Sequence, residues 1–108
     1  MGKRRPATPL PSILPDTLYG ASVDAQIDLH GLRALPALQR VEGFLAGWVD
    51  RKPGAVLRII TGKGTRSVDG PVLLEAVGDM LRKRMGGQVR DMVRDSGGGG
   101  WVVRLGGE

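Results

Sequence analysis

The stretch VDAQIDLHG, residues 23–31, decides the fold class of this 108-residue chain. Apolar residues occupy every second position in it: Val23, Ala25, Ile27 and Leu29. This period is typical of a half-buried strand, whose successive side chains point to opposite faces. We therefore expect Ile27 and Leu29 to point into a core, and Asp28 and His30 to share the other face near the carboxyl end of the strand. Strand ends followed by a glycine are where α/β folds present chemistry.

His30 is the single histidine of the chain, and Asp28 precedes it by two residues. An imidazole has an ordinary pKa of about 6.5, so it can accept or donate a proton at neutral pH. Asp28 can orient the imidazole, favour its cationic form, or hold a divalent cation such as Mg or Mn. The plainer alternative is that the two side chains satisfy one another or cap the next turn.

A helical period begins after His30. Apolar residues recur there at spacings of three and four: Leu38, Val41, Leu45 and Trp48, with Phe44 and Val49 beside them. Pro36 suits a first helical turn, where its missing N–H would have no partner. We predict one amphipathic helix over residues 35–50, ended by Lys52-Pro53-Gly54, with Trp48 packed in the core.

A second strand and a second helix follow. Residues 55–61, AVLRIIT, are mostly apolar and rich in β-branched side chains, as strands are. A strand, a helix and a strand of this length imply parallel pairing with a right-handed crossover. Asp69-Gly70-Pro71 starts the second helix and Gly86-Gly87 stops it. Its predicted buried stripe is Leu73, Leu74, Val77, Met80 and Leu81.

The last part of the chain contains two short predicted strands. They cover residues 88–93 and 101–105 and are joined across Asp95-Ser96-Gly97-Gly98-Gly99-Gly100. The order strand, helix, strand, helix, strand, strand predicts an α/β domain. We interpret the basic run Arg82-Lys83-Arg84 before these strands as structural and solvated, because cations complement the carboxyl end of a helix.

A glycine-rich loop, Gly62-Lys63-Gly64-Thr65-Arg66-Ser67, follows the second strand. Its glycine N–H groups can face a phosphate while Lys63 and Arg66 add positive charge. The loop is not of the Walker type, because Gly64 stands where Ser or Thr should follow the lysine. Alternatively, these glycines only permit positive φ in a tight connection, which is the interpretation we favour for Gly97 to Gly100.

Arg58 and Arg104 alternate away from the apolar residues of their strands. They are expected either to line the same polar sheet face as Asp28 or to be ordinary solvent-facing residues. Trp101 and Tyr19 can stack on bases, although so few aromatic residues argue against a platform for several bases.

Composition limits the classes of protein to which the chain can belong. Its length leaves room for one domain with a modest core, and a formal charge of +5 favours polyanionic partners. The absence of cysteine excludes disulfides and Cys-ligated zinc, and a single histidine excludes the usual multi-His metal sites. No apolar run approaches the roughly 20 residues of a membrane span, and the basic start lacks the apolar stretch of a signal peptide. We therefore expect a soluble, cytoplasmic protein without a membrane partner.

Residues 1–22 differ in kind from residues 23–108. They contain the basic cluster Lys3-Arg4-Arg5 and then prolines at spacings that no helix or central strand accepts: Pro6, Pro9, Pro11 and Pro15. We predict a flexible or extended N-terminal arm, which is either an unstructured tail kept soluble by charge or a nucleic-acid-binding arm. Four apolar residues suggest that part of the arm packs along the domain surface: Leu10, Ile13, Leu14 and Leu18.

Three motifs resemble those of the Smr domain, the small MutS-related domain. Ile27-Asp28-Leu29-His30-Gly31-Leu32 closely resembles the LDxHG signature, with Ile27 in place of the leading leucine. Thr61-Gly62-Lys63-Gly64 resembles the second signature, HGxG or TGxG, and the glycine run before the final strand resembles the third glycine-rich segment. The motifs occur in the proper order, and the resemblance covers residues 23–105 without the arm.

The resemblance implies a two-layer α/β sandwich with a four-stranded mixed sheet, similar to the carboxyl-terminal domain of translation initiation factor three. Smr domains are associated with nucleic acid; several are nicking or RNA-cleaving endonucleases, and others are binding modules. The chain departs from the family pattern at two places. Arg33-Ala34-Leu35 replaces the usual Ser or Thr cap of the first helix, and Thr61 stands where some members carry a second histidine.

The leading hypothesis is therefore a small Smr-type endonuclease that cleaves phosphodiester bonds in DNA or RNA. Such cleavage needs proton transfer and stabilisation of charge on the phosphoryl oxygens. The predicted catalytic residues are Asp28 and His30, and the predicted nucleic-acid contacts are Gly62, Lys63, Gly64, Arg66, Arg58 and Arg104. The hypothesis leaves a Mg or Mn cofactor open. The alternatives are a non-catalytic DNA- or RNA-binding module and a protein-interaction domain that docks through the arm.

Overall fold

The computed structural model describes Leu18, residues 21–62 and residues 70–106. Six elements follow one another in the predicted order. They are β1 (Ala25–Asp28), α1 (Ala34–Arg51), β2 (Val56–Ile60), α2 (Gly70–Lys83), β3 (Val89–Arg94) and β4 (Gly100–Leu105). The bounds of both helices and of the later strands are close to those predicted from the sequence.

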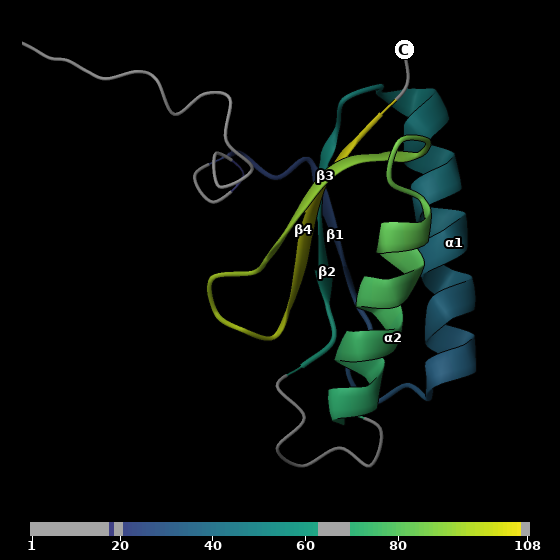
Figure 1. The fold of residues 1–108 in the computed structure, drawn as a ribbon, viewed down its shortest axis with the longest axis vertical. Coiled ribbons are helices and arrows are strands. Elements are labelled where there is room, and N and C mark those ends of the chain that lie inside the picture. The colour runs from purple at the N-terminus through teal and green to yellow at the C-terminus, as the bar shows by residue number, and fades with distance from the viewer. Residues whose placement is uncertain (1–17, 19–20, 63–69, 107–108) are drawn as a thin grey trace, which may run out of the picture.

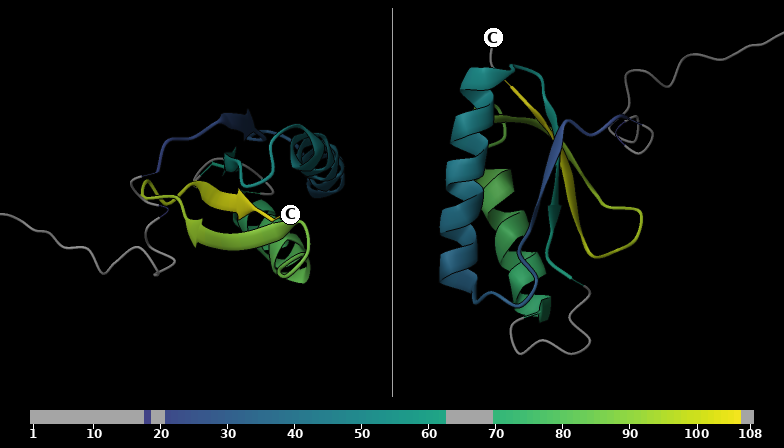
Figure 2. Two further views of the ribbon diagram at one scale, coloured as in Figure 1. Left: turned by 90° about the horizontal axis from the view of Figure 1, so that it is seen from above. Right: turned by 180° about the vertical axis from the view of Figure 1, so that it is seen from behind.

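The two helices lie side by side on one face of the sheet, and neither α1 nor α2 covers the other face (Figures 1 and 2). The strand order is β1-β2-β4-β3. β1 pairs with β2 in parallel, whereas β4 runs antiparallel to both of its neighbours. This arrangement confirms the predicted two-layer α/β sandwich with a four-stranded mixed sheet.

The main core lies between the helices and the sheet. Each helix contributes a fully buried apolar stripe: Ala37, Val41 and Leu45 from α1, and Leu73, Val77 and Leu81 from α2. The partly buried Leu74 and Met80 pack against the same core, and so does Trp48. The stripes and the position of Trp48 were therefore predicted correctly from the helical period.

Trp101 also belongs to this core, and only 7% of its surface is exposed. Its Nε1 donates a hydrogen bond to the Leu74 carbonyl at 3.0 Å. A Cβ built on Gly78 would lie 2.5 Å from Cζ2 of the indole, so the ring occupies the space beside that glycine. The prediction that Trp101 can stack on bases is wrong, because its place on β4 turns the side chain to the face that the helices cover.

A second, smaller cluster lies away from the main core. It contains the buried residues Leu18, Val56 and Val102, with Ala21, Val23 and Val93 packed against them. Leu18 is 2% exposed, which confirms for this residue that part of the N-terminal segment packs along the domain. Leu10, Ile13, Leu14 and the cluster Lys3-Arg4-Arg5 lie outside the described residues, as does Tyr19.

Val23 does not continue the alternation of β1. The chain bends at Asp24, whose carboxylate accepts hydrogen bonds from the Val56 backbone N–H at 2.9 Å and from Lys52 Nζ at 2.6 Å. The strand therefore begins only at Ala25. Val23 joins the smaller cluster rather than the main core, so the regular alternation of the strand does not extend back to Val23.

Both helices begin at the end of the sheet where β1 and β2 finish, which is the lower end in Figure 1. The residue before α1 is Arg33, and no side-chain hydrogen bond caps the helix there, as the absence of Ser or Thr predicted. In the described part of the chain, neither helix is long and apolar enough to cross a membrane.

The buried position of Leu18 makes a prediction about the arm. We expect Leu18→Ala to lower the free energy of unfolding by about 2 kcal/mol or more, because it removes apolar contacts and leaves a cavity. Leu35→Ala is the matched control, since Leu35 is 67% exposed; its effect should stay within about 0.5 kcal/mol. Urea denaturation of both variants measures the difference. Equal effects would show that Leu18 does not anchor the segment.

Candidate functional site

The turn after β1 presents His30 to solvent. Leu29 is fully buried, and its N–H donates to the Ile60 carbonyl at 2.7 Å. The Leu32 N–H donates back to the Leu29 carbonyl at 3.0 Å, and Gly31 has a φ of 84°. A positive φ at the third residue is typical of a type II turn, which explains the glycine. The buried leucine and the turn hold His30 outside the core, where 73% of its side chain is exposed.

Asp28 and His30 are in direct contact. Asp28 Oδ1 lies 2.7 Å from His30 Nδ1 and also accepts the His30 backbone N–H at 3.0 Å. A carboxylate that binds the N–H two residues further along is a recurring local motif for Asp. The predicted shared face is confirmed. The contact also fits both sequence interpretations, since the same pair orients the imidazole and satisfies itself.

The pair fixes which imidazole nitrogen is available to a ligand. The hydrogen bond from the His30 side chain, followed by that from its backbone N–H, holds the pKa of Asp28 below its usual value of 3.8, while burial opposes the shift. At neutral pH the carboxylate is therefore ionised and can only accept hydrogen bonds. Nδ1 must carry the shared hydrogen when the imidazole is neutral, which leaves the Nε2 lone pair as the proton acceptor.

The second motif lies beside the first. A Cβ built on Gly62 would lie 3.5 Å from the Cβ of His30, and the φ of Gly62 is 89°. The Thr61 and Gly62 N–H groups both donate to the Gly99 carbonyl, at 2.8 and 3.0 Å. The third motif therefore holds the second one against His30. Lys63, Gly64 and Arg66 lie outside the described residues, so their predicted contacts remain predictions.

Thr61 has a structural place in this arrangement. It is 2% exposed, and its Oγ1 lies within hydrogen-bonding distance of the Gly62 and Gly99 carbonyls, at 3.2 and 3.3 Å. A buried hydroxyl satisfied in this way cannot take the place of a solvent-facing imidazole. His30 is thus the one imidazole that the site can use, as the sequence indicated.

The glycine run has a conformational role. Gly98 has a φ of 83°, and Gly100 lies so close to the Ile59 carbonyl that there is no room for a Cβ. The favoured interpretation of a tight connection is thus confirmed at Gly98. The role of Gly99 was not predicted, because a backbone carbonyl that accepts two hydrogen bonds has no signature in a run of identical residues.

Arg58 lies on the same sheet face as Asp28. It is the register partner of Gln26, two residues before Asp28, and its Nη1 lies 3.5 Å from Gln26 Oε1. Its Nε forms an ion pair with Asp95 Oδ1 at 3.3 Å, in a geometry that makes no hydrogen bond. Asp95 was not predicted; its sequence position, in the loop before the glycines, carries no signal of this pairing.

Arg104 lies on the same face but at the other end of the sheet. Its register partner is Val56, whereas the partner of Asp28 is Ile60 at the opposite end of β2. The structure therefore brings Arg58 close to the Asp28–His30 pair and leaves Arg104 distant from it. Within the described residues the Arg104 side chain forms no hydrogen bond or ion pair.

The described residues contain no group of three His, Asp or Glu side chains that could hold a metal ion. Asp28 is the one carboxylate in contact with His30 there. Mg²⁺ is commonly held by one or two carboxylates together with substrate phosphates. Asp28 can thus supply one ligand to such an ion, and a bound nucleic acid would have to supply others.

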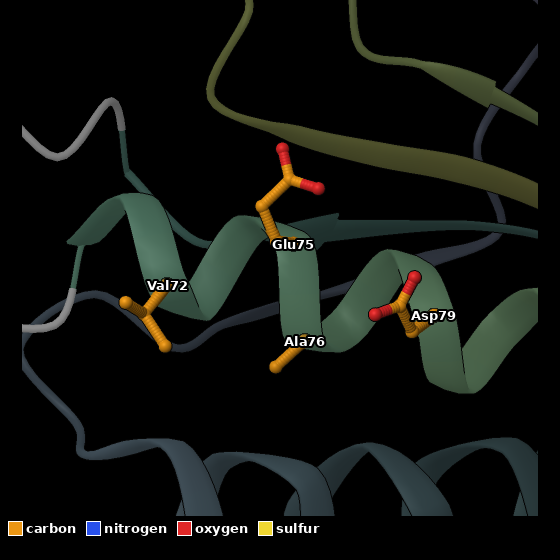
Figure 3. A pocket seen from close by; sticks show the side chains of 4 residues that line it. All are labelled: Val72, Glu75, Ala76 and Asp79. Carbon is orange, nitrogen blue, oxygen red and sulfur yellow. The ribbon is translucent and has the colours of Figure 1, made fainter.

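A separate pocket of about 380 Å³ lies on the outer side of α2 (Figure 3). It is lined by Val72, Glu75, Ala76 and Asp79, which come from successive turns of one side of the helix. It contains none of the predicted site residues. Asp79 is paired with Arg82 at 3.0 Å, and the Glu75 carboxylate would repel a phosphate that entered the pocket itself.

The fold and site define a two-layer α/β domain with a solvent-facing acid–imidazole pair at the carboxyl end of parallel strands. The model of the Smr domain family matches residues 27–105. The chain therefore belongs to the Smr domain family, and this membership indicates a nucleic-acid-binding or nuclease-related function. No curated protein and no solved structure matches the chain.

The lowered pKa of Asp28 makes a prediction about pH. A carboxyl group whose pKa is lower in the folded state stabilises the fold above its unfolded pKa and loses this effect as pH falls. We expect Asp28→Asn to be less stable than the natural protein at about pH 5, by up to roughly 1 kcal/mol because the pair is exposed. The difference should shrink as pH falls through the pKa of Asp28 in the folded protein, because the carboxyl group is then protonated in both the folded and the unfolded states. Urea denaturation at each pH tests this, and a constant difference would contradict it.

Proposed function

We propose that this protein is a small endonuclease that cleaves phosphodiester bonds in DNA or RNA. His30 is the proton-transfer residue of the proposal, and Asp28 positions its imidazole. The observation that supports it is the 2.7 Å contact between Asp28 Oδ1 and His30 Nδ1 on an imidazole that is 73% exposed. A structural histidine is normally satisfied inside a fold, whereas this side chain is mostly exposed and its contact with Asp28 uses Nδ1, so Nε2 is the nitrogen left for a substrate.

The proposed chemistry follows from the state of the pair. Nε2 of neutral His30 accepts the proton of the attacking oxygen, either of water or of a ribose 2′-hydroxyl, as that oxygen forms its bond to phosphorus. The imidazolium that results is stabilised by the ionised Asp28 carboxylate at Nδ1. The bond from phosphorus to the leaving oxygen then breaks on the opposite side, because the attacking and leaving oxygens lie in line. The leaving oxygen takes a proton from water, and the imidazolium releases its proton to water.

The surroundings of His30 suit a phosphate. Gly62 has no side chain to block the approach to His30, and both helices begin at this end of the sheet. The amino end of a helix carries partial positive charge, which favours anions. Lys63 and Arg66 would add full charges from the loop that follows Gly62.

The second candidate is a non-catalytic DNA- or RNA-binding module. It is favoured by the chain's single imidazole and by the local way in which Asp28 and His30 satisfy each other. Glycines next to a cationic loop bind phosphates without any proton transfer. The two functions differ in one measurable property, which is cleavage of a bound substrate.

The catalytic prediction concerns His30 and Asp28. We expect His30→Ala to lower the cleavage rate by about 10²–10⁴-fold, which is the usual contribution of a positioned proton-transfer group. Asp28→Ala should also lose most cleavage. Asp28→Asn should recover part of it, because an amide oxygen still accepts the Nδ1 hydrogen. Labelled RNA and DNA panels, each with and without Mg²⁺ or Mn²⁺, measure the rates.

Binding should survive these substitutions, since affinity resides mainly in Lys and Arg contacts to phosphates. Each variant should stay folded, with a loss of stability of no more than roughly 1 kcal/mol for the exposed Asp28 pair. Gln26→Ala is the control, because Gln26 is exposed on the same face of β1; it should cleave at nearly the natural rate. Full cleavage by a folded His30→Ala protein would refute the catalytic assignment and favour the binding module. Loss of cleavage only in proportion to loss of folding would have the same meaning.

The loop prediction concerns Lys63 and Arg66. Neutralising both should weaken binding to all sequences and flatten the dependence of affinity on salt. Each lost phosphate contact reduces the log–log salt slope by about 0.7 for single strands and about 0.9 for duplex DNA. Fluorescence binding titrations over a range of salt concentrations measure the slope. A double variant with an unchanged slope would show that the loop does not bind phosphates.

A further inference from the structure

Two arginines lie against the ring of Trp101. The guanidinium carbon of Arg82 is 5.5 Å from the ring centroid, and that of Arg94 is 5.4 Å from it. Arg82 comes from the last turn of α2 and Arg94 from the end of β3, so the indole ring contacts two cations from different elements. We call Arg82 and Arg94 the edge arginines, because β3 is an outer strand of the sheet.

The indole that carries these cations is rigidly held. Its Nε1 is bonded to the Leu74 carbonyl at 3.0 Å, and one edge of the ring fills the space beside Gly78. Cations stacked on a fixed aromatic ring have fewer rotamers to lose when they bind a ligand. With 7% of its surface exposed, Trp101 itself cannot stack on a base. It can only position the two arginines.

Both guanidinium groups remain accessible to an anion. Arg94 has no carboxylate partner within the described residues; its Nη2 lies 3.4 Å from the Gly98 carbonyl. Arg82 pairs with Asp79 at 3.0 Å, but the two side chains are 56% and 68% exposed, so solvent screens that pair. Lys83, next to Arg82 in the sequence, is also exposed and has no ion pair in the described part of the chain.

The edge arginines are separated from His30 by the width of the sheet, because His30 follows β1 and Arg94 ends β3. Gly99, whose carbonyl holds Thr61 and Gly62 beside His30, is two residues before Trp101. From β1 to β3 there are three inter-strand spacings, or about 14 Å at roughly 4.8 Å each. A stacked strand rises 3.4 Å per nucleotide, so about four nucleotides cover this distance.

We propose that the edge arginines, held by Trp101, form a second phosphate-binding site for a single nucleic-acid strand. This strand runs from His30 across the end of β2 and the start of β4. Planar guanidinium groups bind phosphate oxygens in pairs of hydrogen bonds. Glycines at the intervening connections, Gly62 and the run Gly97 to Gly100, leave the strand room to lie close to the backbone. The proposal rests on nucleic-acid binding but not on cleavage.

The test is the salt dependence of binding by Arg82→Gln/Arg94→Gln. We expect the slope for a single-stranded oligomer of about twenty nucleotides to fall in magnitude by about 1.4, which is two lost contacts at 0.7 each. An oligomer of about three nucleotides is too short to reach from His30 to the edge arginines, so its affinity should fall much less. Arg94→Gln alone should reduce the slope by about 0.7 and serves if the double variant does not fold.

The matched control is Arg40→Gln/Arg51→Gln on α1. Arg51 also stacks on a tryptophan, 4.9 Å from the ring centroid of Trp48, and Arg40 is exposed. This control removes the same charge and should leave the slope unchanged. An equal fall in the control, an unchanged slope in the edge variant, or a lower melting temperature with an unchanged slope would each overturn the proposal. If the natural protein binds without cleaving, the endonuclease assignment fails and the edge site stands; if it binds no nucleic acid, both fail.

Discussion

The site depends on one backbone group, the carbonyl of Gly99. It accepts the N–H groups of Thr61 and Gly62, and so fastens the start of β4 to the end of β2. Close pairing continues at Gly100, where contact with the Ile59 carbonyl excludes any side chain. Because β1 pairs in parallel with β2, this contact also brings the third glycine motif to the end of the sheet where His30 lies. Three segments far apart in the sequence become one site mainly through hydrogen bonds between backbone groups.

The hydrophobic periodicity of the sequence, with the glycines and prolines that end its elements, was sufficient to predict most of the fold. The alternation at Ile27 and Leu29 and the stripes of both helices depend on which side chains avoid water, and this information is local. It failed at Val23, where the Asp24 carboxylate takes the Val56 N–H and turns the chain. It also failed at Trp101, whose ring is covered by α2 through contacts with Leu74 and Gly78. Such packing and long-range capping join residues that no short window of sequence contains.

The residues of the candidate site also divide into those that local sequence predicted and those that depend on contacts between distant segments. Asp28 and His30 were found because they are adjacent on one strand, where spacing alone sets their common face. The ion pair of Arg58 with Asp95 was not found, because it joins β2 to the loop after β3. Arg104 was grouped with Asp28 correctly by face, yet it lies at the opposite end. A strand pattern reports the face of a residue, whereas its position along the sheet needs the pairing partner.

The distribution of charge limits how this protein can hold a polyanion. Arg58, the described arginine on the Asp28 face that lies nearest to the pair, is already matched by Asp95, and Asp28 places a negative charge beside His30. A phosphate at His30 therefore meets little net positive charge from the described residues of that face. The surplus of +5 must act from elsewhere in the chain. Cations around the site would then attract the polyanion and make its binding depend on salt concentration. The nearly neutral surroundings of His30 would leave its imidazole able to accept and donate a proton.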